Sequence, residues 1–225
     1  MNLSVIIPIF NEEKTIGIVL KELLLVAAVK QIIVVDDGST DKSVKEVQKI
    51  KSKKIVLVKK ENGGKGSAIR LGLKKVTQKY VLIQDADLEY HPEDIKVLID
   101  PIRKRPNVLV VYGSRFLGSR SNLLYWHMLG NKLLNFFVNI LFDTTLSDLE
   151  TCYKLIPTQL MKELDLSSDG FDIEVEITCQ LLKKGVRIYE VPISYFGRDF
   201  RAGKKITWKD GLTAIVAILK YRVQS

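Results

Sequence analysis

Short runs of branched apolar residues alternate with helical patterns between residues 4 and 84, and this alternation limits the possible folds more strongly than any other feature of the chain. Runs rich in valine and isoleucine lie at Ser4–Ile9, Gln31–Val35, Lys54–Val58 and Tyr80–Gln84. Helical patterns lie between them at Glu13–Ala28, Lys42–Ile50 and Gly66–Val76. Such alternation is typical of parallel sheets with right-handed crossovers. The sequence therefore predicts an α/β fold, a three-layer α/β/α sandwich around a mostly parallel central sheet.

The second half of the chain continues with less regular elements. We predict helices at Pro92–Arg103 and Asp169–Lys184, and strands at Val108–Tyr112 and Val186–Ile193. The stretch Leu123–Phe142 is rich in apolar residues, but polar residues recur every fourth position at His127, Asn131, Asn135 and Asn139. This polar stripe, together with Lys132, argues against a transmembrane span. A buried helix, or a helix that lies at a membrane interface, fits the pattern better.

Composition places the chain among reduced globular proteins with an anionic partner. Its 225 residues suit one domain, and the 46% hydrophobic content suffices for a core. Two distant cysteines, Cys152 and Cys179, form neither a disulfide framework nor a zinc motif, which favours a cytosolic protein. We see no signal peptide and no spanning segment. The net charge of +9 indicates binding to nucleic acid, a phosphorylated small molecule or a membrane surface.

Polar clusters follow four of the predicted strands. They lie at Pro8–Glu13, Asp36–Asp41, Glu61–Gly66 and Asp85–Glu89. One such cluster is usually only a turn. Because ligands of open α/β sheets bind at the carboxyl ends of the strands, four clusters at one edge indicate a binding site.

The cluster after the fourth strand has the composition of a metal site. Asp85 and Asp87 bring two carboxylates close together, and a divalent cation would offset their repulsion. Hard oxygen ligands suit Mg²⁺ or Mn²⁺, which also bridge phosphates, and Glu89 is a candidate third ligand. The alternative is that Asp87 or Glu89 only begins the next helix.

The glycine-rich loop Gly63–Gly66 opens a predicted helix, and its N–H groups favour an anion. The loop matches neither a Walker A motif nor a dinucleotide fingerprint. A kinase, a GTPase or a nicotinamide-dependent dehydrogenase is therefore disfavoured.

Taken in order, four motifs resemble the signature of family 2 inverting glycosyltransferases with the Rossmann-like GT-A fold. The motifs are IPIFNEE from Ile7, VVDDGSTD from Val34, NGGKG from Asn62 and DAD from Asp85. Within that family the chain is most similar to the dolichyl-phosphate mannose synthase-like branch. The resemblance implies a nucleoside pocket lined by Pro8, Asn11, Glu12 and Asp37, with Lys65 and Gly66 on its nucleotide side. It also implies that Asp85 and Asp87, assisted by Glu89, hold the metal on the donor diphosphate.

The acceptor half, residues 113–200, contains candidates for two kinds of acceptor. Arg115 follows a strand and would meet phosphate groups, as a similar Arg does in the related enzymes. A sugar hydroxyl acceptor requires a base, for which Asp148 is the first candidate and Glu150 the second. A lipid phosphate is already mostly ionised at neutral pH and requires no strong base.

The end of the chain is basic and then amphipathic. Tyr195–Lys205 resembles the basic loop of the lipid-phosphate branch, in which Arg198 and Lys205 would bind phosphate. We expect residues 201–225 to contact a membrane surface, to pack on the domain as a C-terminal helix, or to do both.

The sequence thus predicts one GT-A domain over residues 1–200, with residues 1–112 as its nucleotide-sugar and metal half. The expected reaction is Mg²⁺- or Mn²⁺-dependent transfer of mannose or glucose from a GDP- or UDP-linked sugar to a polyprenyl phosphate. We expect Asp87, Arg115, Asp148 and Arg198 to be catalytic. The expected place is the cytoplasmic face of a membrane, reached directly or through a membrane partner. The alternatives are transfer to a glycan hydroxyl and, more remotely, a nucleic-acid-binding protein, for which no recognition motif is present.

Overall fold

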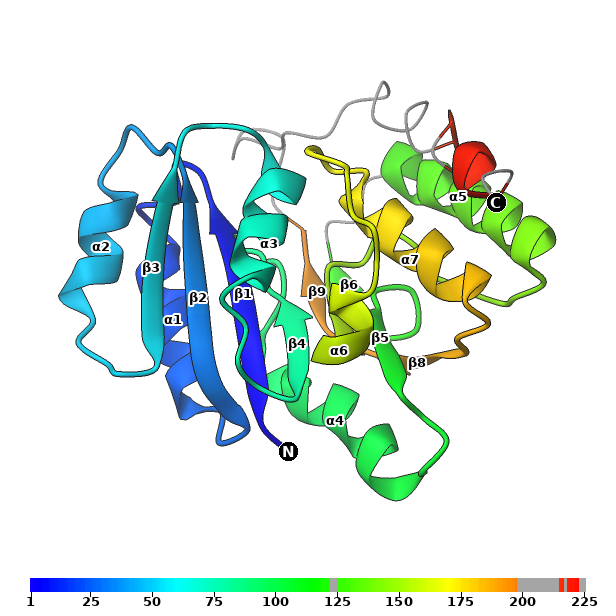
Figure 1. The fold of residues 1–225 in the computed structure, drawn as a ribbon, viewed down its shortest axis with the longest axis horizontal. Helices are drawn as coiled ribbons and strands as arrows, with labels where there is room; N and C mark the ends of the chain where they lie inside the picture. Colours follow the sequence, from blue (N-terminus) through cyan, green and yellow to red (C-terminus); the bar gives the residue numbers. More distant parts are fainter. Residues whose placement is uncertain (122–124, 198–214, 217, 223–225) are drawn as a thin grey trace.

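The computed structural model describes residues 1–121, 125–197, 215–216 and 218–222 (Figure 1). The larger sheet contains β1 (Leu3–Ile9), β2 (Val29–Asp37), β3 (Ile55–Lys60), β4 (Tyr80–Ile83), β5 (Val110–Ser114), β7 (Lys154–Pro157) and β8 (Ile188–Pro192). Its strand order is β3-β2-β1-β4-β7-β5-β8. Only the pairings of β7 with β4 and β5 are antiparallel. The mostly parallel α/β sandwich is therefore confirmed. A second, two-stranded sheet pairs β6 (Arg120–Ser121) with β9 (Tyr195–Phe196).

Helices cover both faces of the sheet (Figure 1). In the first half they are α1 (Ile16–Leu25), α2 (Ser43–Lys49), α3 (Lys65–Leu73), the 3₁₀ turn η1 (Pro92–Asp94) and α4 (Ile95–Lys104). In the second half they are α5 (Tyr125–Phe142), α6 (Thr158–Lys162) and α7 (Ile173–Lys183). Strands β1 to β3 are added toward one edge of the sheet, whereas β4 pairs with the other side of β1. Right-handed crossovers therefore place α3 on the face opposite α1 (Figure 1).

The predicted strands and helices are present, with ends that differ by a few residues. The predicted helix Glu13–Ala28 is shorter in the structure, where α1 covers Ile16–Leu25. The short strands β6 and β9 were not predicted. Nor were β7 and α6, which both follow the acidic segment around Asp148. β7 has no alternating pattern because both faces are covered, so that its four residues are nearly all buried.

The helix α5 belongs to a second, smaller core. Leu134 and Val138 of α5 pack with Val175 and Cys179 of α7. Ile218 and Tyr221 join the same cluster, so the predicted packing of the C-terminal helix on the domain is confirmed for the described part of that helix. No helix in the described ranges is both long and apolar enough to cross a membrane.

Candidate active site

Hydrogen bonds and an ion pair connect the four predicted polar clusters at the carboxyl edge of the parallel strands. Asn11 links the first cluster to the second, because its Oδ1 accepts the N–H of Thr40 at 2.8 Å. Asp37 links the second to the third, and Lys65 links the third to the fourth. Strand ends far apart in sequence therefore form one continuous site, which we call the carboxyl edge.

The first two clusters hold each other in place. Asn11 has a positive φ of 57°, which asparagine tolerates better than most residues, and its N–H donates to Ser39 Oγ at 3.0 Å. The N–H of Glu12 donates to Ser43 Oγ at 2.7 Å. Pro8 lies near the end of β1, opposite Val35 of β2. These contacts join the residues that the sequence predicts to line a nucleoside pocket.

Asp37 organises the glycine-rich loop. Its carboxylate accepts the N–H groups of Gly63 and Gly64 at 2.9 and 2.8 Å, and Lys60 Nζ lies 2.6 Å from Oδ1. The aspartate is buried at 4% exposure. It therefore holds the glycine-rich loop in place, a role that the motif alone does not reveal.

The N-terminus of α3 is covered by another part of the chain. The N–H groups of Gly66 and Ser67 donate to the carbonyl of Asp169 at 2.8 and 3.3 Å. A Cβ atom on Gly64 or Gly66 would lie 2.3 Å from a carbonyl of the 168–170 segment. The lack of a side chain at these glycines therefore allows the segment before α7 to approach closely. The sequence instead predicts that this loop binds an anion.

Lys65 bridges the two halves of the domain. Its Nζ lies 2.7 Å from Asp85 Oδ1 and 2.7 Å from Glu174 Oε1. Burial opposes the charge, but the two carboxylates raise the pKa of Lys65 well above its usual value. Glu174 is 3% exposed and comes from α7. The sequence suggests this residue only weakly, because its acidic neighbours there are typical of the start of a helix.

The acidic residues after β4 do not form a three-carboxylate site. Among the described residues, no three His, Cys, Asp or Glu side chains lie close enough together to hold a metal ion. Glu89 Oε2 instead accepts a hydrogen bond from the hydroxyl of Tyr195 at 2.6 Å. The predicted set of Asp85, Asp87 and Glu89 is thus not assembled as a triad. A cation at this position would need oxygens from the substrate as well.

Arg115 and Asp148 form a buried ion pair. Asp148 is 0% exposed and accepts the main-chain N–H, Nε and Nη2 of Arg115 at 2.9, 2.8 and 2.7 Å. Burial opposes the charge, but Asp148 raises the pKa of Arg115 well above its usual value. A carboxylate bound on both oxygens is poorly placed to accept a proton. The geometry therefore disfavours Asp148 as a general base.

Two asparagines of the polar stripe of α5 face the segment that carries Asp148. Asn135 accepts the N–H of Leu149 at 2.8 Å and donates to the carbonyl of Ser147 at 2.7 Å. Asn139 contacts Leu146 in the same two ways. The stripe therefore fixes the loop between α5 and β7. Arg198 and Lys205, which the sequence also predicts to bind phosphate, lie outside the described residues.

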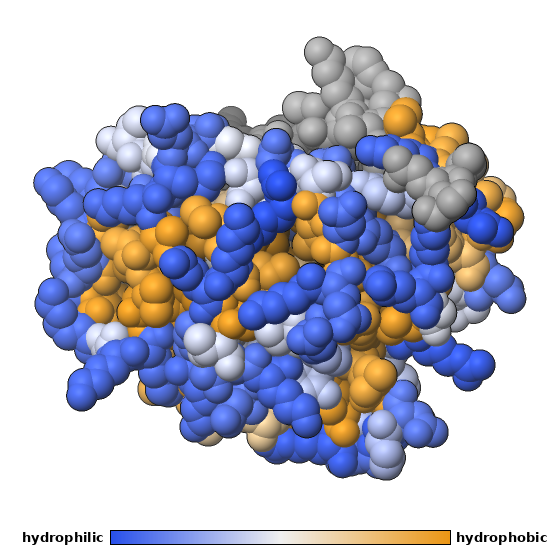
Figure 2. Space-filling model, in the orientation of Figure 1, coloured by the Kyte–Doolittle hydropathy of each residue, from blue (hydrophilic) through white to orange (hydrophobic). Residues whose placement is uncertain are grey.

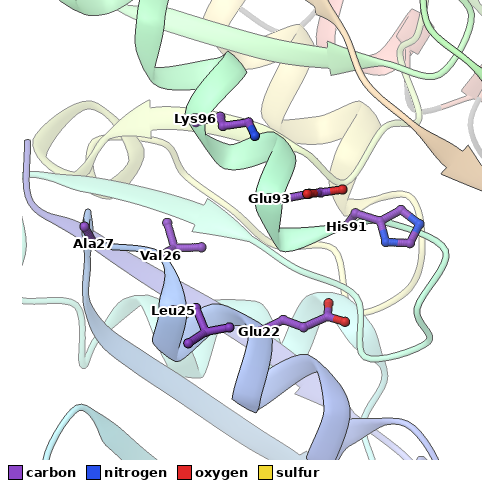
Figure 3. Close-up of a pocket in the computed structure, with 7 residues that line it drawn as sticks. All are labelled: Glu22, Leu25, Val26, Ala27, His91, Glu93 and Lys96. Carbon is purple, nitrogen blue, oxygen red and sulfur yellow. The ribbon is translucent and has the colours of Figure 1, made fainter.

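A separate pocket of about 520 Å³ lies between α1 and the start of α4 (Figure 3). Its lining residues are Glu22, Leu25, Val26, Ala27, His91, Glu93 and Lys96. None of the predicted site residues lines it.

Comparisons with known proteins agree with this architecture. Glucosyl-3-phosphoglycerate synthase from Mycobacterium tuberculosis, in complex with Mn²⁺, UDP and phosphoglyceric acid, matches with a TM-score of 0.78 and 18% identity. That match covers 100% of this chain and 79% of the synthase chain. The fold is thus that of the GT-A glycosyltransferases.

Comparison of the sequence with protein-family models shows the family to which the chain belongs. The model of glycosyl transferase family 2 matches residues 4–165, and the chain therefore belongs to that family. An uncharacterised protein of Methanocaldococcus jannaschii is 33% identical, over 96% of this chain and 97% of its own length. Glycosyltransferase AglJ of Haloferax volcanii is 26% identical, over 86% of this chain and 63% of its own length. The chain is accordingly a glycosyltransferase.

Proposed function

We propose that this glycosyltransferase moves a hexose, mannose or glucose, from a GDP- or UDP-linked sugar to a polyprenyl phosphate at a membrane surface. Membership of family 2 supports transfer from a nucleotide sugar. The complexes of the mycobacterial synthase with Mn²⁺ and UDP-glucose support a nucleoside diphosphate donor and a divalent cation. The identity of the acceptor depends on a separate observation, the surface of α5.

On the donor side, we propose Asp85 and Asp87 as the metal ligands. Mg²⁺ and Mn²⁺ are commonly bound by one or two carboxylates together with substrate phosphates, so two aspartates fit the group without a third. Lys65 Nζ lies 2.7 Å from Asp85 Oδ1, so this carboxylate already has one cationic partner on the donor side. When bound, the metal would neutralise charge on the leaving diphosphate. Lys65 would supply a further positive charge on the same side of the sheet.

An exposed apolar stripe on α5 carries the proposal for a lipid-linked acceptor. Tyr125, Leu129, Leu133, Phe136 and Ile140 follow helical spacing and are 62%, 43%, 49%, 57% and 63% exposed. Hydrophobic residues are visible at the upper right of Figure 2, where Figure 1 places α5 and the C-terminal helix.

The charge of α5 fits the same partner. The helix carries one basic residue, Lys132, and no acidic residue. Val216 and Leu219, on the described part of the C-terminal helix, are 64% and 49% exposed. An apolar stripe with cationic neighbours suits an anionic bilayer surface, where a polyprenyl phosphate resides.

The chemistry of a phosphate acceptor agrees with the state of Arg115 and Asp148. An ionised phosphate oxygen attacks the anomeric carbon directly, so the protein needs to supply only alignment and positive charge. The contacts to Asp148 occupy three donors of Arg115 and leave Nη1 for a phosphate oxygen.

A hydroxyl acceptor is the second candidate, with Glu150 as the base. Burial raises the pKa of Glu150, which moves this carboxyl toward the range in which a base works at neutral pH. Transfer to a glycan hydroxyl that is lost in Glu150→Gln would favour this alternative.

The proposal is tested by transfer of labelled sugar to polyprenyl phosphate in vesicles with Mn²⁺, using GDP-mannose and UDP-glucose in turn. We expect the double substitution Leu133→Ser and Phe136→Ser to lower transfer at least ~10-fold, because about 1.5–3 kcal/mol of burial is lost for each large side chain. Nucleotide-sugar affinity should not change. Leu25→Ser is the control, since Leu25 is 85% exposed on α1. Transfer equal to wild type in the double variant would refute the lipid surface. If no sugar is transferred from either GDP-mannose or UDP-glucose, polyprenyl phosphate is refuted as the acceptor.

A further inference from the structure

Lys154 is a buried lysine that no part of the proposed reaction uses. It lies at the start of β7, opposite Tyr112 of β5, and is 1% exposed. Among the described residues, no carboxylate oxygen lies within ion-pair distance of its Nζ. A buried ammonium is costly unless hydrogen bonds satisfy it, so its partners define what it does.

The ammonium of Lys154 binds two backbone carbonyls of one loop. Nζ donates to the carbonyl of Leu149 at 2.8 Å and to that of Thr151 at 2.6 Å. It also lies 4.3 Å from the centre of the Tyr112 ring, a cation–π contact. The hydroxyl of Tyr112 lies 3.0 Å from Thr178 Oγ1, which fixes this ring against α7. The charge is thus held in a rigid setting and directed at the loop.

The two carbonyls lie on either side of Glu150. The same loop carries Asp148, which holds Arg115, while Asn135 and Glu190 bind the main chain of its first half. The segment from Leu149 to Thr151 therefore receives its buried cationic support from Lys154. A shift of this segment would move the residues that face the acceptor.

We propose that Lys154 is a positioning residue for glycosyl transfer, whose ammonium holds the Leu149–Thr151 segment, so that loss of the charge releases the acceptor side of the site. The assignment of an acceptor side rests on the proposed function. The contacts of Lys154 with the loop do not depend on it.

The proposal predicts a pH dependence. Burial lowers the pKa of Lys154 to about 8. Glu174, Asp148 and Cys152 act to raise this pKa, whereas Arg115 lowers it further. The titratable and charged groups that face it are Glu174 and Cys179 of α7, Tyr112 of β5, Arg115, and Asp148, Glu150 and Cys152 of the loop. One pH unit above this pKa, about a tenth of the molecules keep the charge.

Stability and activity should respond to this titration in opposite directions. The folded pKa lies below the unfolded value, so between them the unfolded state binds more protons, and stability from this group rises with pH. Activity should instead fall about fivefold from pH 8 to pH 9, because the charged fraction falls from about one half to about a tenth. A loss of activity caused only by unfolding would be accompanied by a fall in the melting temperature.

The experiment measures kcat/KM for polyprenyl phosphate and the melting temperature of the full chain from pH 6.5 to 9.5. Lys154→Arg should move the fall in activity beyond pH 9.5, because guanidinium stays charged. Lys154→Met should lower kcat/KM about tenfold at pH 7, leave no fall near pH 8 and keep nucleotide-sugar affinity. Lys162→Met is the control, since Lys162 also donates to a carbonyl, that of Val76, but is exposed. Wild-type activity that stays level to pH 9.5 would overturn the proposal, even where the variants do not fold.

A second readout separates this proposal from that for the acceptor. Hydrogen exchange of the 147–153 segment, corrected for the intrinsic effect of pH, should rise between pH 7 and 9 in the wild type but not in Lys154→Arg. If exchange rises in this way but no sugar is transferred to the lipid, the proposed acceptor is refuted and the positioning role of Lys154 is supported. Unchanged protection across this range would overturn the role of Lys154, whatever the acceptor is.

Discussion

Replacing Asp148 with alanine removes the carboxylate that three N–H groups of Arg115 contact at 2.7–2.9 Å. Removing one partner of a buried ion pair typically costs about 3–5 kcal/mol, because the other charge stays buried and unpaired. The Arg115 side chain retains 14% exposure, which allows some hydration. We therefore expect a loss near the lower limit, about 3 kcal/mol of the free energy of unfolding.

This loss is large enough to measure by urea denaturation and by thermal melting. For a domain of this size, 1 kcal/mol corresponds to about 2–4 °C, so Asp148→Ala should melt about 6–12 °C lower. Asp148→Asn keeps the volume but replaces charge-assisted bonds with neutral ones, and should lose about half as much free energy. Asp100→Asn is the control. Asp100 is 55% exposed and pairs with Lys104 on the surface of α4, where such pairs contribute about 0.3–0.5 kcal/mol.

Two results would refute this reasoning. A change below about 1 kcal/mol in Asp148→Ala would mean that Arg115 is not desolvated as the structure indicates. If Asp148→Asn kept its stability but lost a factor of about 10²–10⁴ in kcat, Asp148 would be acting as a general base.

Two further substitutions test the loop before α7 and the helix that ends the chain. Gly64→Ala should lose about 1–3 kcal/mol in urea denaturation, since Gly64 has a φ of 94° and its Cβ would meet the Asp169 carbonyl. Gly17→Ala, whose Cβ meets nothing within 4 Å, should not be destabilised; equal losses would contradict the clash. Burial acts to raise the pKa of Glu176, but hydrogen bonds from Tyr221, Ser168 and Ser167 outweigh it and lower this pKa. The stability that Glu176 adds is therefore present above its unfolded pKa and lost as pH falls through the lower folded value. Melting temperatures between pH 3 and 7 should fall less steeply in Glu176→Gln, and parallel curves would contradict the assignment.

The positions of the donor-side residues could be predicted from the sequence because they depend on local patterns. A strand that ends in a polar cluster places that cluster at the carboxyl edge in any parallel α/β sheet. Asn11, Asp37 and Asp85 accordingly lie on the expected strands or directly after them. Their contacts were less predictable. Asp37 binds the loop of Gly63 and Gly64, a contact that depends on how closely the end of β2 approaches residues 26 positions away.

The acceptor half could be predicted only in outline. The antiparallel strand β7 enters the sheet between β4 and β5, although β5 precedes it in the chain. That insertion brings Arg115 to Asp148, 33 positions away in the sequence. No spacing in the sequence encodes this contact, because the proximity of the two residues depends on strand order.

The sequence by itself determined the α/β class, the carboxyl edge with its polar clusters and the resemblance to family 2. These properties follow from the periodicity of apolar residues and from short motifs, which act over a few residues. Only the tertiary structure decided which charges are paired. Lys65 lies between Asp85 and Glu174, Arg115 binds Asp148, and the apolar stripe of α5 is exposed while its asparagines face inward. Pairing depends on distance and burial in three dimensions, and a linear pattern specifies neither.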